Sequence, residues 1–382
     1  MIDLKFSNKV LLLLFFTVLL TSLWPKNIYV MVLFASATYI LLPFRDWDQV
    51  CSFLMLFSFS YAIMAIMHGD IGSGFTLISY IIAPLAFYRF GRWLMYMFRD
   101  DILRQKLFLA IILSYSLALF ILTVKDTSIV GVVNISRVML EDAGDDSSLA
   151  ATLYGLMASI GIGCVSCLFA KEQKMSLRLF FIFLAFFSLF TVIHLVNRTG
   201  IIVFFSCMVL SMFVVTRLKV FKMIPMLVIF FIIGLFLINM GIINDDVLIA
   251  YQNREMDSYA NVSELGGRLG IWSDAILKLA TNPFGWPRVR YAHNLWLDIA
   301  RVGGWLPFFF FLLATITWVK KCFRLAKRHT TFNLLLLSIN FAMLLASFVE
   351  PVMDASMLFF SIMMMVWGCT TYVSQEKLKT VE

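Results

Sequence analysis

Long apolar runs recur along almost the whole chain, and they constrain its fold more than any motif does. A helix that crosses a membrane needs about 20 mostly apolar residues. Hydrophobic residues make up 61% of the 382 residues and charged residues only 14%, far from the composition of a soluble domain. About twelve runs qualify, at roughly 10–24, 27–43, 49–67, 74–90, 107–124, 148–170, 179–196, 199–216, 223–243, 302–319, 332–349 and 356–373. The sequence therefore predicts an all-α polytopic membrane protein with about twelve transmembrane helices.

Lysine and arginine cluster in the short segments between these runs, where they act as orientation signals. With both termini in the cytoplasm, about two thirds of the basic residues fall on the cytoplasmic side, and the acidic residues show the opposite bias. A missed helix would invert every later loop, so this agreement supports the count of twelve. Because the orientation signals account for the formal net charge of +8, nucleic acid is not an expected partner, whereas membrane lipids are.

We expect a single transmembrane domain over residues 1–382, without a soluble domain. Its largest polar interruption is an outer loop at about 244–301. Trp272, Ile276 and Leu279 stand at helical spacing in that loop, so part of it should fold as a helix against the membrane surface. The six cysteines lie in apolar runs or in a basic loop, so no disulfide framework is expected.

Arg198 is the first candidate for chemistry. It follows the seventh apolar run in the sequence HLVNRTG, and the next run begins almost at once. An ionisable group at the membrane boundary is a functional candidate. A guanidinium suits a diphosphate, because its planar fork donates paired hydrogen bonds and keeps its charge. The structural alternative is an interfacial anchor at a tight turn, and position alone leaves both open.

Further candidates lie in the long outer loop. Arg268 stands among glycines, and basic groups beside flexible backbone can converge on an anionic headgroup. Arg288 and Arg290 come later in the loop; attraction to anionic lipid explains them slightly better, and Arg290 is kept as a supporting candidate.

His293 lies just before the tenth apolar run, in YAHNLWLD. Its pKa near neutrality makes it one of the few side chains able to accept a proton from a sugar hydroxyl, and the alternative is a structural hydrogen bond. Asp298 is well off the helical face of His293, so it should support the fold or pair with Arg301.

The sequence carries no Walker A motif, no H-E-x-x-H and no other zinc-ligand spacing. We therefore expect neither a metal nor a cofactor. The energy for any reaction must come from the substrate itself.

Three elements in order resemble the O-antigen ligase and polymerase family of bacterial lipid-linked glycan transferases. They are Arg198 with Gly200, Arg268 with Trp272 followed by Asn282-Pro283 and Gly285, and His293-Asn294 followed by Gly303-Gly304. For the first 150 residues the resemblance is one of hydropathy and helix number alone.

The resemblance implies a GT-C-like helical bundle in the bacterial inner membrane, with a periplasmic loop cap over the active site. Arg198 and Arg268 would bind the undecaprenyl diphosphate of a glycan donor and stabilise charge on the leaving group. His293 would orient or deprotonate the acceptor hydroxyl, giving inversion without a required metal. Trp272, Asn294 and Asp298 would be supporting residues.

Ligases and polymerases of this family share the donor and differ in the acceptor, which is either the lipid A core or another lipid-linked glycan. The loops lack an R-x(10)-G pattern associated with some polymerases, so the sequence favours an O-antigen ligase in lipopolysaccharide biosynthesis. A polymerase is the first alternative. The alternative from another class is a twelve-helix secondary transporter, which should show matched halves; here polarity concentrates instead in one late outer loop.

Overall fold

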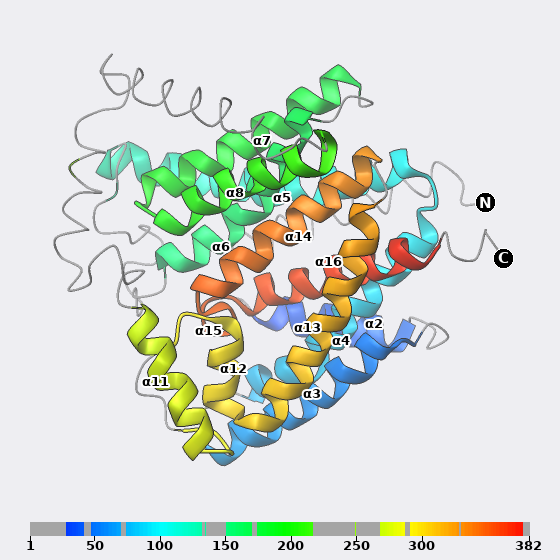
Figure 1. Cartoon of the computed structure of the whole chain (residues 1–382). Helices are drawn as coiled ribbons and strands as arrows, with labels where there is room; N and C mark the ends of the chain where they lie inside the picture. The colour runs from blue at the N-terminus through cyan, green and yellow to red at the C-terminus, as the bar shows by residue number, and fades with distance from the viewer. Residues whose placement is uncertain are drawn as a thin grey trace.

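The computed structural model describes residues 28–41, 47–69, 74–131, 134, 150–169, 174–216, 249, 268–286, 291–327 and 330–376. All regular structure in these ranges is helical (Figure 1). The elements are α2 (Ile28–Leu41), α3 (Gln49–Met67), α4 (Gly74–Met97), α5 (Asp101–Val130), α6 (Ala150–Ile162), the 3-10 helix η3 (Gly163–Phe169), α7 (Met175–His194), α8 (Arg198–Thr216), α11 (Arg268–Thr281), α12 (Leu295–Gly303), α13 (Trp305–Ala326), α14 (Thr331–Val349), α15 (Val352–Ala355) and α16 (Met357–Glu376).

The helices follow the predicted apolar runs closely. Eight of them in the described part of the chain are long and apolar enough to cross a membrane, and two shorter apolar helices, Met31–Leu41 and Arg198–Val214, match two more of the runs. The runs predicted at about 10–24 and 223–243 lie outside the described residues. The chain is therefore an all-α, multi-pass membrane protein, as predicted.

Two helices extend further than the sequence suggested. The runs predicted at 74–90 and 107–124 become α4 and α5, which continue through basic residues that hydropathy had placed in a loop. Two of these cations have buried acceptors. Arg92 pairs with Asp48 at 2.6 Å, and the guanidinium of Arg104 donates to the carbonyls of Met95 and Phe98 and pairs with Glu376 at 2.8 Å. A paired cation can stay inside a helix bundle, which a hydropathy window does not anticipate.

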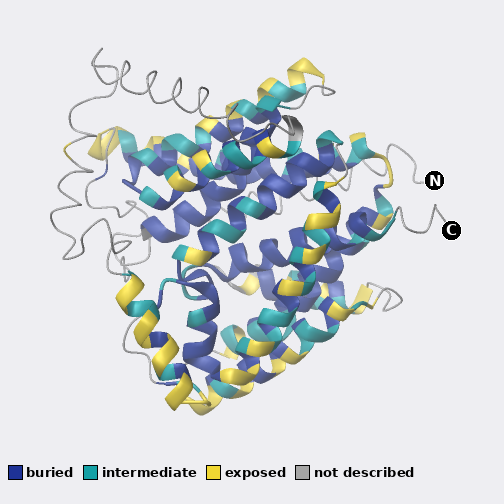
Figure 2. Ribbon diagram, viewed as in Figure 1, coloured by how far each residue is buried: buried dark blue, intermediate teal, exposed yellow. Residues whose placement is uncertain are grey.

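The helices form two groups that share a centre. The helices α2, α3, α4, α13 and α16 pack together, and α5, α6, η3, α7, α8 and α14 form the second group (Figure 1). Of the most apolar stretch of α16, 94% is buried, compared with 28% for α13, so α16 is the central helix and α13 faces outward (Figure 2). The helices α11, α12 and α15 lie together at one end, beside the end of α14 (Figure 1).

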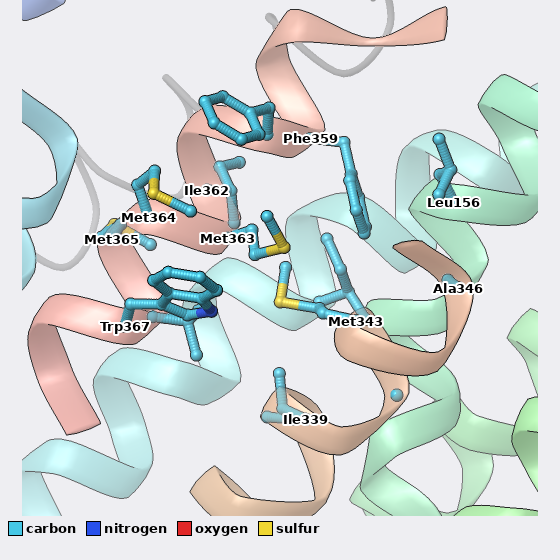
Figure 3. Packing of buried hydrophobic residues seen from close by; sticks show 14 of the residues in the cluster. Leu156, Ile339, Met343, Ala346, Phe359, Ile362, Met363, Met364, Met365 and Trp367 are labelled. Atoms are coloured by element: carbon cyan, nitrogen blue, oxygen red, sulfur yellow. The ribbon is translucent and has the colours of Figure 1, made fainter. Parts of the chain in front are cut away.

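Large flexible side chains fill the space where the two groups meet (Figure 3). Met343 of α14 and Met363 of α16 are 0% and 1% exposed. Within the first group, the indole rings of Trp318 of α13 and Trp367 of α16 stack with their centroids 4.3 Å apart. Methionine adapts to irregular gaps, and stacked aromatic rings bury a large area. The core therefore joins both groups into one domain over the described residues.

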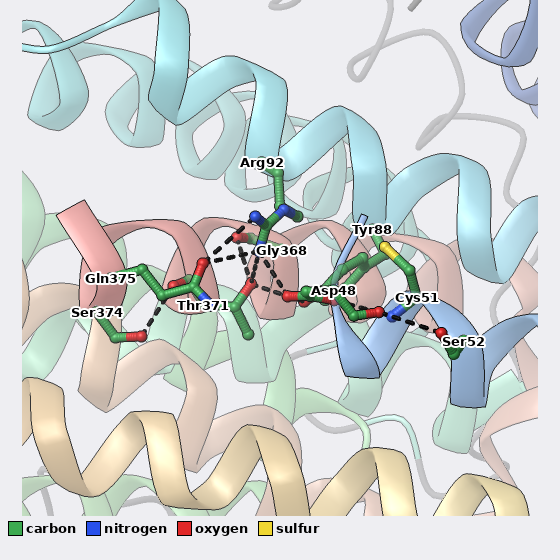
Figure 4. A network of polar contacts seen from close by, with 9 residues as sticks. All are labelled: Asp48, Cys51, Ser52, Tyr88, Arg92, Gly368, Thr371, Ser374 and Gln375. Atoms are coloured by element: carbon green, nitrogen blue, oxygen red, sulfur yellow. Dashed lines mark hydrogen bonds and ion pairs between the residues drawn. The ribbon is translucent and has the colours of Figure 1, made fainter. Parts of the chain in front are cut away.

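A buried polar network lies at the end of α16 far from α15 (Figure 4). Arg92 donates to the Asp48 carboxylate at 2.6 Å and to Gln375. The Tyr88 hydroxyl donates to Asp48, and its oxygen also lies 2.8 Å from the hydroxyl oxygen of Thr371. We refer to Asp48, Tyr88, Arg92, Thr371 and Gln375 as the Asp48 cluster. It ties the beginning of α3 to the ends of α4 and α16.

Candidate functional site

The start of α8 presents Arg198. Only three residues, 195–197, separate α7 from α8, and Asn197 caps α8 by accepting a hydrogen bond from the Gly200 amide at 3.1 Å. Arg198 is the first helical residue and is half-buried. The unpaired amides and the dipole at a helix N-terminus favour anions. The fold thus adds a second source of positive potential to the guanidinium.

A buried carboxylate lies beside this helix start. Glu350, at the C-terminal end of α14, is 5% exposed. One of its carboxylate oxygens accepts a hydrogen bond from Thr199 at 2.8 Å and the other accepts one from Thr152 of α6 at 3.1 Å. A buried carboxylate needs such donors to offset the loss of hydration.

Arg268 reaches the same carboxylate from a different element. It begins α11, and its guanidinium lies 3.6 Å from Glu350 with 22% of the side chain exposed. An arginine fork has five donors, so a single carboxylate leaves it able to hold a second anion. We refer to Thr152, Thr199, Arg268 and Glu350 as the Glu350 cluster.

The helix α11 forms over Arg268–Thr281, as the spacing of Trp272, Ile276 and Leu279 predicted, but these three residues do not share one buried face. Leu279 packs inward and is 4% exposed, while Ile276 is 58% exposed. Trp272 donates from its indole nitrogen to the carbonyl of Ala292 at 2.8 Å. Trp272 therefore connects the helix that carries Arg268 to the residue that precedes His293.

His293 stands at the tip of a tightly held turn. Its φ of 52° lies in the left-handed region, which few non-glycine residues adopt. The carboxylate of Asp298 accepts hydrogen bonds from the backbone amides of the two residues that flank His293, namely Ala292 at 2.8 Å and Asn294 at 3.2 Å. Tyr291 packs edge-on against the imidazole with ring centroids 6.3 Å apart. The turn fixes where the half-buried imidazole is presented.

Asn294 has two structural tasks. Its side-chain oxygen caps α12 by accepting from the amides of Trp296 and Leu297. Its side-chain nitrogen donates to the carbonyl of Phe348 at 3.0 Å, two residues before Glu350. The His293 turn is thereby joined to the segment that carries the Glu350 carboxylate.

Asp298 is held in a dense group of charges. Its carboxylate lies 3.6 Å from Arg301, the pairing expected from the sequence, and Arg301 also pairs with Asp354 of α15 at 3.1 Å. Burial, together with the nearby Asp354 carboxylate, raises the pKa of Asp298 to about 7. Asp298 therefore supports the His293 turn with a carboxyl that titrates near neutrality.

The segments 282–286 and 301–305 are joined by two backbone hydrogen bonds, and we call this contact the interlock. The Trp286 amide donates to the Arg301 carbonyl, and the Trp305 amide donates to the Pro283 carbonyl. A Cβ on Gly304, whose φ is 67°, would come within 2.1 Å of the Pro283 carbonyl oxygen, so only glycine permits this approach. The interlock joins the C-terminal end of α11 to the junction of α12 and α13.

Most of the predicted site is thus brought to one end of the bundle. Arg268 and Thr199, the neighbour of Arg198, meet at Glu350, and Asn294 binds the adjoining backbone. Arg290 lies outside the described residues. The sequence placed α12 in a polar loop, but it is a buried helix, since Leu295, Trp296 and Ile299 face the main core.

Sequence reasoning missed Glu350, the carboxylate that contacts Thr152, Thr199 and Arg268. The signal was present: an acidic residue directly follows the eleventh apolar run and precedes a proline. A carboxylate at a membrane boundary is costly unless it has partners, and those partners were distant in sequence.

A hollow of about 290 Å³ adjoins the His293 turn. Ile271, Asp274 and Lys278 of α11 line one side, and Trp286 and Ala292 line the other. Among the described residues, no group of three or more His, Cys, Asp or Glu side chains is arranged to hold a metal ion.

Comparison with protein families and with curated proteins finds no match for this chain.

Proposed function

We propose that this protein is a membrane glycosyltransferase of the O-antigen ligase type. It transfers a preassembled glycan from undecaprenyl diphosphate to the lipid A core, at the periplasmic face of a bacterial inner membrane. The proposal is carried by one observation: Arg268, Thr199 beside Arg198, and Asn294 beside His293 all bind the short segment from Phe348 to Glu350.

Two arginines suit the donor. Arg198 at a helix N-terminus and Arg268, one-fifth exposed, would bind the diphosphate and stabilise the charge that develops as it leaves. Glu350 keeps the guanidinium of Arg268 in place before the donor arrives. This preorganisation removes part of the entropy cost of binding.

His293 suits the acceptor. In the proposed step, the acceptor hydroxyl oxygen attacks the anomeric carbon of the donor sugar and the bond from that carbon to the diphosphate oxygen breaks. The hydroxyl proton passes to the imidazole of His293 and the electron pair leaves with the diphosphate. Attack from the face opposite the leaving group inverts the anomeric centre, and no metal is needed.

A deletion strain provides the test. Its lipopolysaccharide profile on a gel is compared after complementation with wild-type protein, His293→Ala or empty vector, with membrane expression measured for each. Arg99→Ala is a matched control, because Arg99 is an exposed residue of the 98–100 segment between α4 and α5, away from the Glu350 cluster. We expect His293→Ala to lose core-linked O-antigen and Arg99→Ala to retain it.

Each result has a distinct reading. Loss of core-linked O-antigen together with accumulation of long lipid-linked polymer supports a ligase. Single capped units without a ladder would replace that proposal with the polymerase that shares this donor. A deletion strain with an unchanged profile would exclude both and turn the search to another surface glycan or to transport.

A further inference from the structure

A closed ring of buried polar residues underlies the turn that presents Arg198. His194, the last residue of α7, is 0% exposed, and its Nε2 lies 2.8 Å from the Asp126 carboxylate of α5. Asn134 donates from its side chain to the same carboxylate oxygen at 2.6 Å, and its backbone amide donates to the His194 carbonyl at 2.8 Å. Each member of the ring therefore bonds to both of the others.

The ring is the last of a series of polar contacts between α5 and α7. The hydroxyls of Thr123 and Thr191 lie 3.0 Å apart, and those of Ser116 and Ser188 lie 3.5 Å apart. These pairs recur along one buried face of each helix. The two helices are thus held in register up to the residue where α7 ends.

The turn after the ring is strained. Val196 has a φ of 50°, in the left-handed region that a β-branched side chain rarely adopts. Its amide donates to the Ile193 carbonyl, and the amide of Asn197 donates to Val192. Such a conformation persists only where the surroundings enforce it, and it is often found at functional sites.

The far side of the turn is equally fixed. The Asn197 side chain donates to the carbonyl of Ala151 in α6 at 3.0 Å while its oxygen caps α8. Arg198 is the next residue. Its backbone is therefore held between the ring on one side and α6 on the other, only four residues from His194.

We propose that His194 and Asp126 are positioning residues for Arg198. The inference rests on the proposed function and deepens it. The Nε2–H of His194 donates to Asp126, this bond fixes the end of α7, and the strained turn then sets the direction in which the guanidinium enters the diphosphate site. A fully buried imidazole does not reach a substrate hydroxyl, so this role is distinct from that of His293.

Non-additivity provides the first test. Transfer from an undecaprenyl-diphosphate-linked glycan is measured in proteoliposomes for His194→Leu, His194→Gln and Arg198→Ala, and for His194→Leu combined with Arg198→Ala. We expect His194→Leu to lower kcat/KM by about tenfold or more, and His194→Gln to recover most of the loss because its amide can still donate. In the Arg198→Ala background the same change should lower kcat/KM by less than about threefold.

Two further variants separate positioning from general packing. Thr191→Val breaks the neighbouring contact of the same helix pair and should change transfer by less than about threefold. The exchange Asp126→Asn with Asn134→Asp keeps one carboxylate and one amide in the ring and should exceed Asp126→Asn alone in activity. The proposal would be overturned if the effects of His194→Leu and Arg198→Ala on kcat/KM were fully additive. It would also be overturned if Thr191→Val lowered kcat/KM as much as His194→Leu does.

A readout without catalysis separates this proposal from the proposed function. A nitroxide is attached to Arg198→Cys in a background whose six native cysteines are replaced by alanine, and its mobility is read by electron paramagnetic resonance. We expect His194→Leu to increase this mobility and Thr191→Val to leave it unchanged. If wild-type protein transfers no glycan but the mobility responds as expected, the function fails and the positioning stands; an unresponsive label overturns the positioning.

Discussion

The Asp48 cluster and the Glu350 cluster each contain one arginine and one carboxylate, at opposite ends of the bundle, yet they are closed to different degrees. In the first, Arg92 is 4% exposed and lies 2.6 Å from Asp48, and Gln375 accepts from both of its terminal nitrogens. In the second, Arg268 is 22% exposed and lies 3.6 Å from Glu350. Among the described residues, the guanidinium of Arg92 is therefore closely held and almost fully buried, whereas that of Arg268 is loosely held and partly exposed.

This difference fits a structural role for the first ion pair and the proposed binding role for the second. A closely held buried pair contributes mainly by avoiding the cost of an unpaired charge. A guanidinium that keeps free donor positions at a partly open surface can accept another anion. The residue types in the sequence do not separate these two kinds of ion pair. The exposed fraction of the arginine and its distance from the carboxylate do separate them.

The largest effect on stability is expected at the closed cluster. Arg92→Ala leaves the Asp48 carboxylate without its cation, which should cost about 3–5 kcal/mol of the free energy of unfolding. The Tm measured in nanodiscs and the steady-state amount of protein in the membrane should both fall. Replacing both charges, as Arg92→Met with Asp48→Asn, should restore much of the stability, because the asparagine oxygen can still accept a hydrogen bond from Tyr88. A stable Arg92→Ala protein would show that this pair does not support the fold.

Substitutions in the Glu350 cluster should reduce glycan transfer more than they reduce stability. Glu350→Ala removes the group that holds Arg268, and transfer should fall by about 10²–10³-fold, the size seen when one preorganised electrostatic contact is lost. Glu350→Gln keeps acceptor and donor groups for Thr152 and Thr199 but removes the charge, so it should lie between wild type and Glu350→Ala. Equal activity in all three would exclude Glu350 from the site.

A charge-conserving change sharpens the comparison further. Arg268→Lys keeps the positive charge but loses the fork that holds two anions at once, so transfer should fall by about 10–100-fold with little change in Tm. Arg99→Lys is the control, because Arg99 is an exposed arginine outside the site. Similar losses in both variants would point to expression or folding rather than to diphosphate binding.

The smallest expected effect is a pH dependence of stability. The pKa of Asp298 is raised from 3.8 to about 7 in the folded protein, so between these values the folded state holds a proton that the unfolded state has released. Stability from this group is therefore greatest at low pH and decreases until the pH reaches about 7. Tm of wild type should fall by a few degrees from pH 5 to pH 7.5, and Asp298→Asn should lose this part of the dependence.

The sequence was sufficient for the architecture because hydropathy reports directly on the membrane. The helices α3, α14 and α16 lie within a few residues of their predicted runs, and the helical spacing of Trp272 and Leu279 predicted α11. Boundaries failed where charges are paired, as in α4 and α5, because pairing depends on residues that are distant in sequence.

The candidate residues could be singled out from the sequence, but their arrangement could not. The motif positions Arg198, Arg268 and His293 stand out because polar groups are rare in this chain. Glu350 and the ring formed by His194, Asp126 and Asn134 were missed, since each matters through contacts across the bundle. The helical nature of α12 was also missed, because polar residues at both of its ends hide its buried face.

The interlock between Gly285 and Gly304 has a mechanical consequence for Arg268. It anchors α11 at its C-terminal end, and the bond from Trp272 to Ala292 anchors the same helix near its start. The helix α11 has 14 residues and is therefore about 21 Å long. Held only at the far end, a tilt of about 10° would swing its tip by roughly 4 Å over that length. Because Trp272 also fixes the helix, only about 6 Å of it, from Trp272 to Arg268, lies beyond the second contact. The same tilt then moves Arg268 by only about 1 Å.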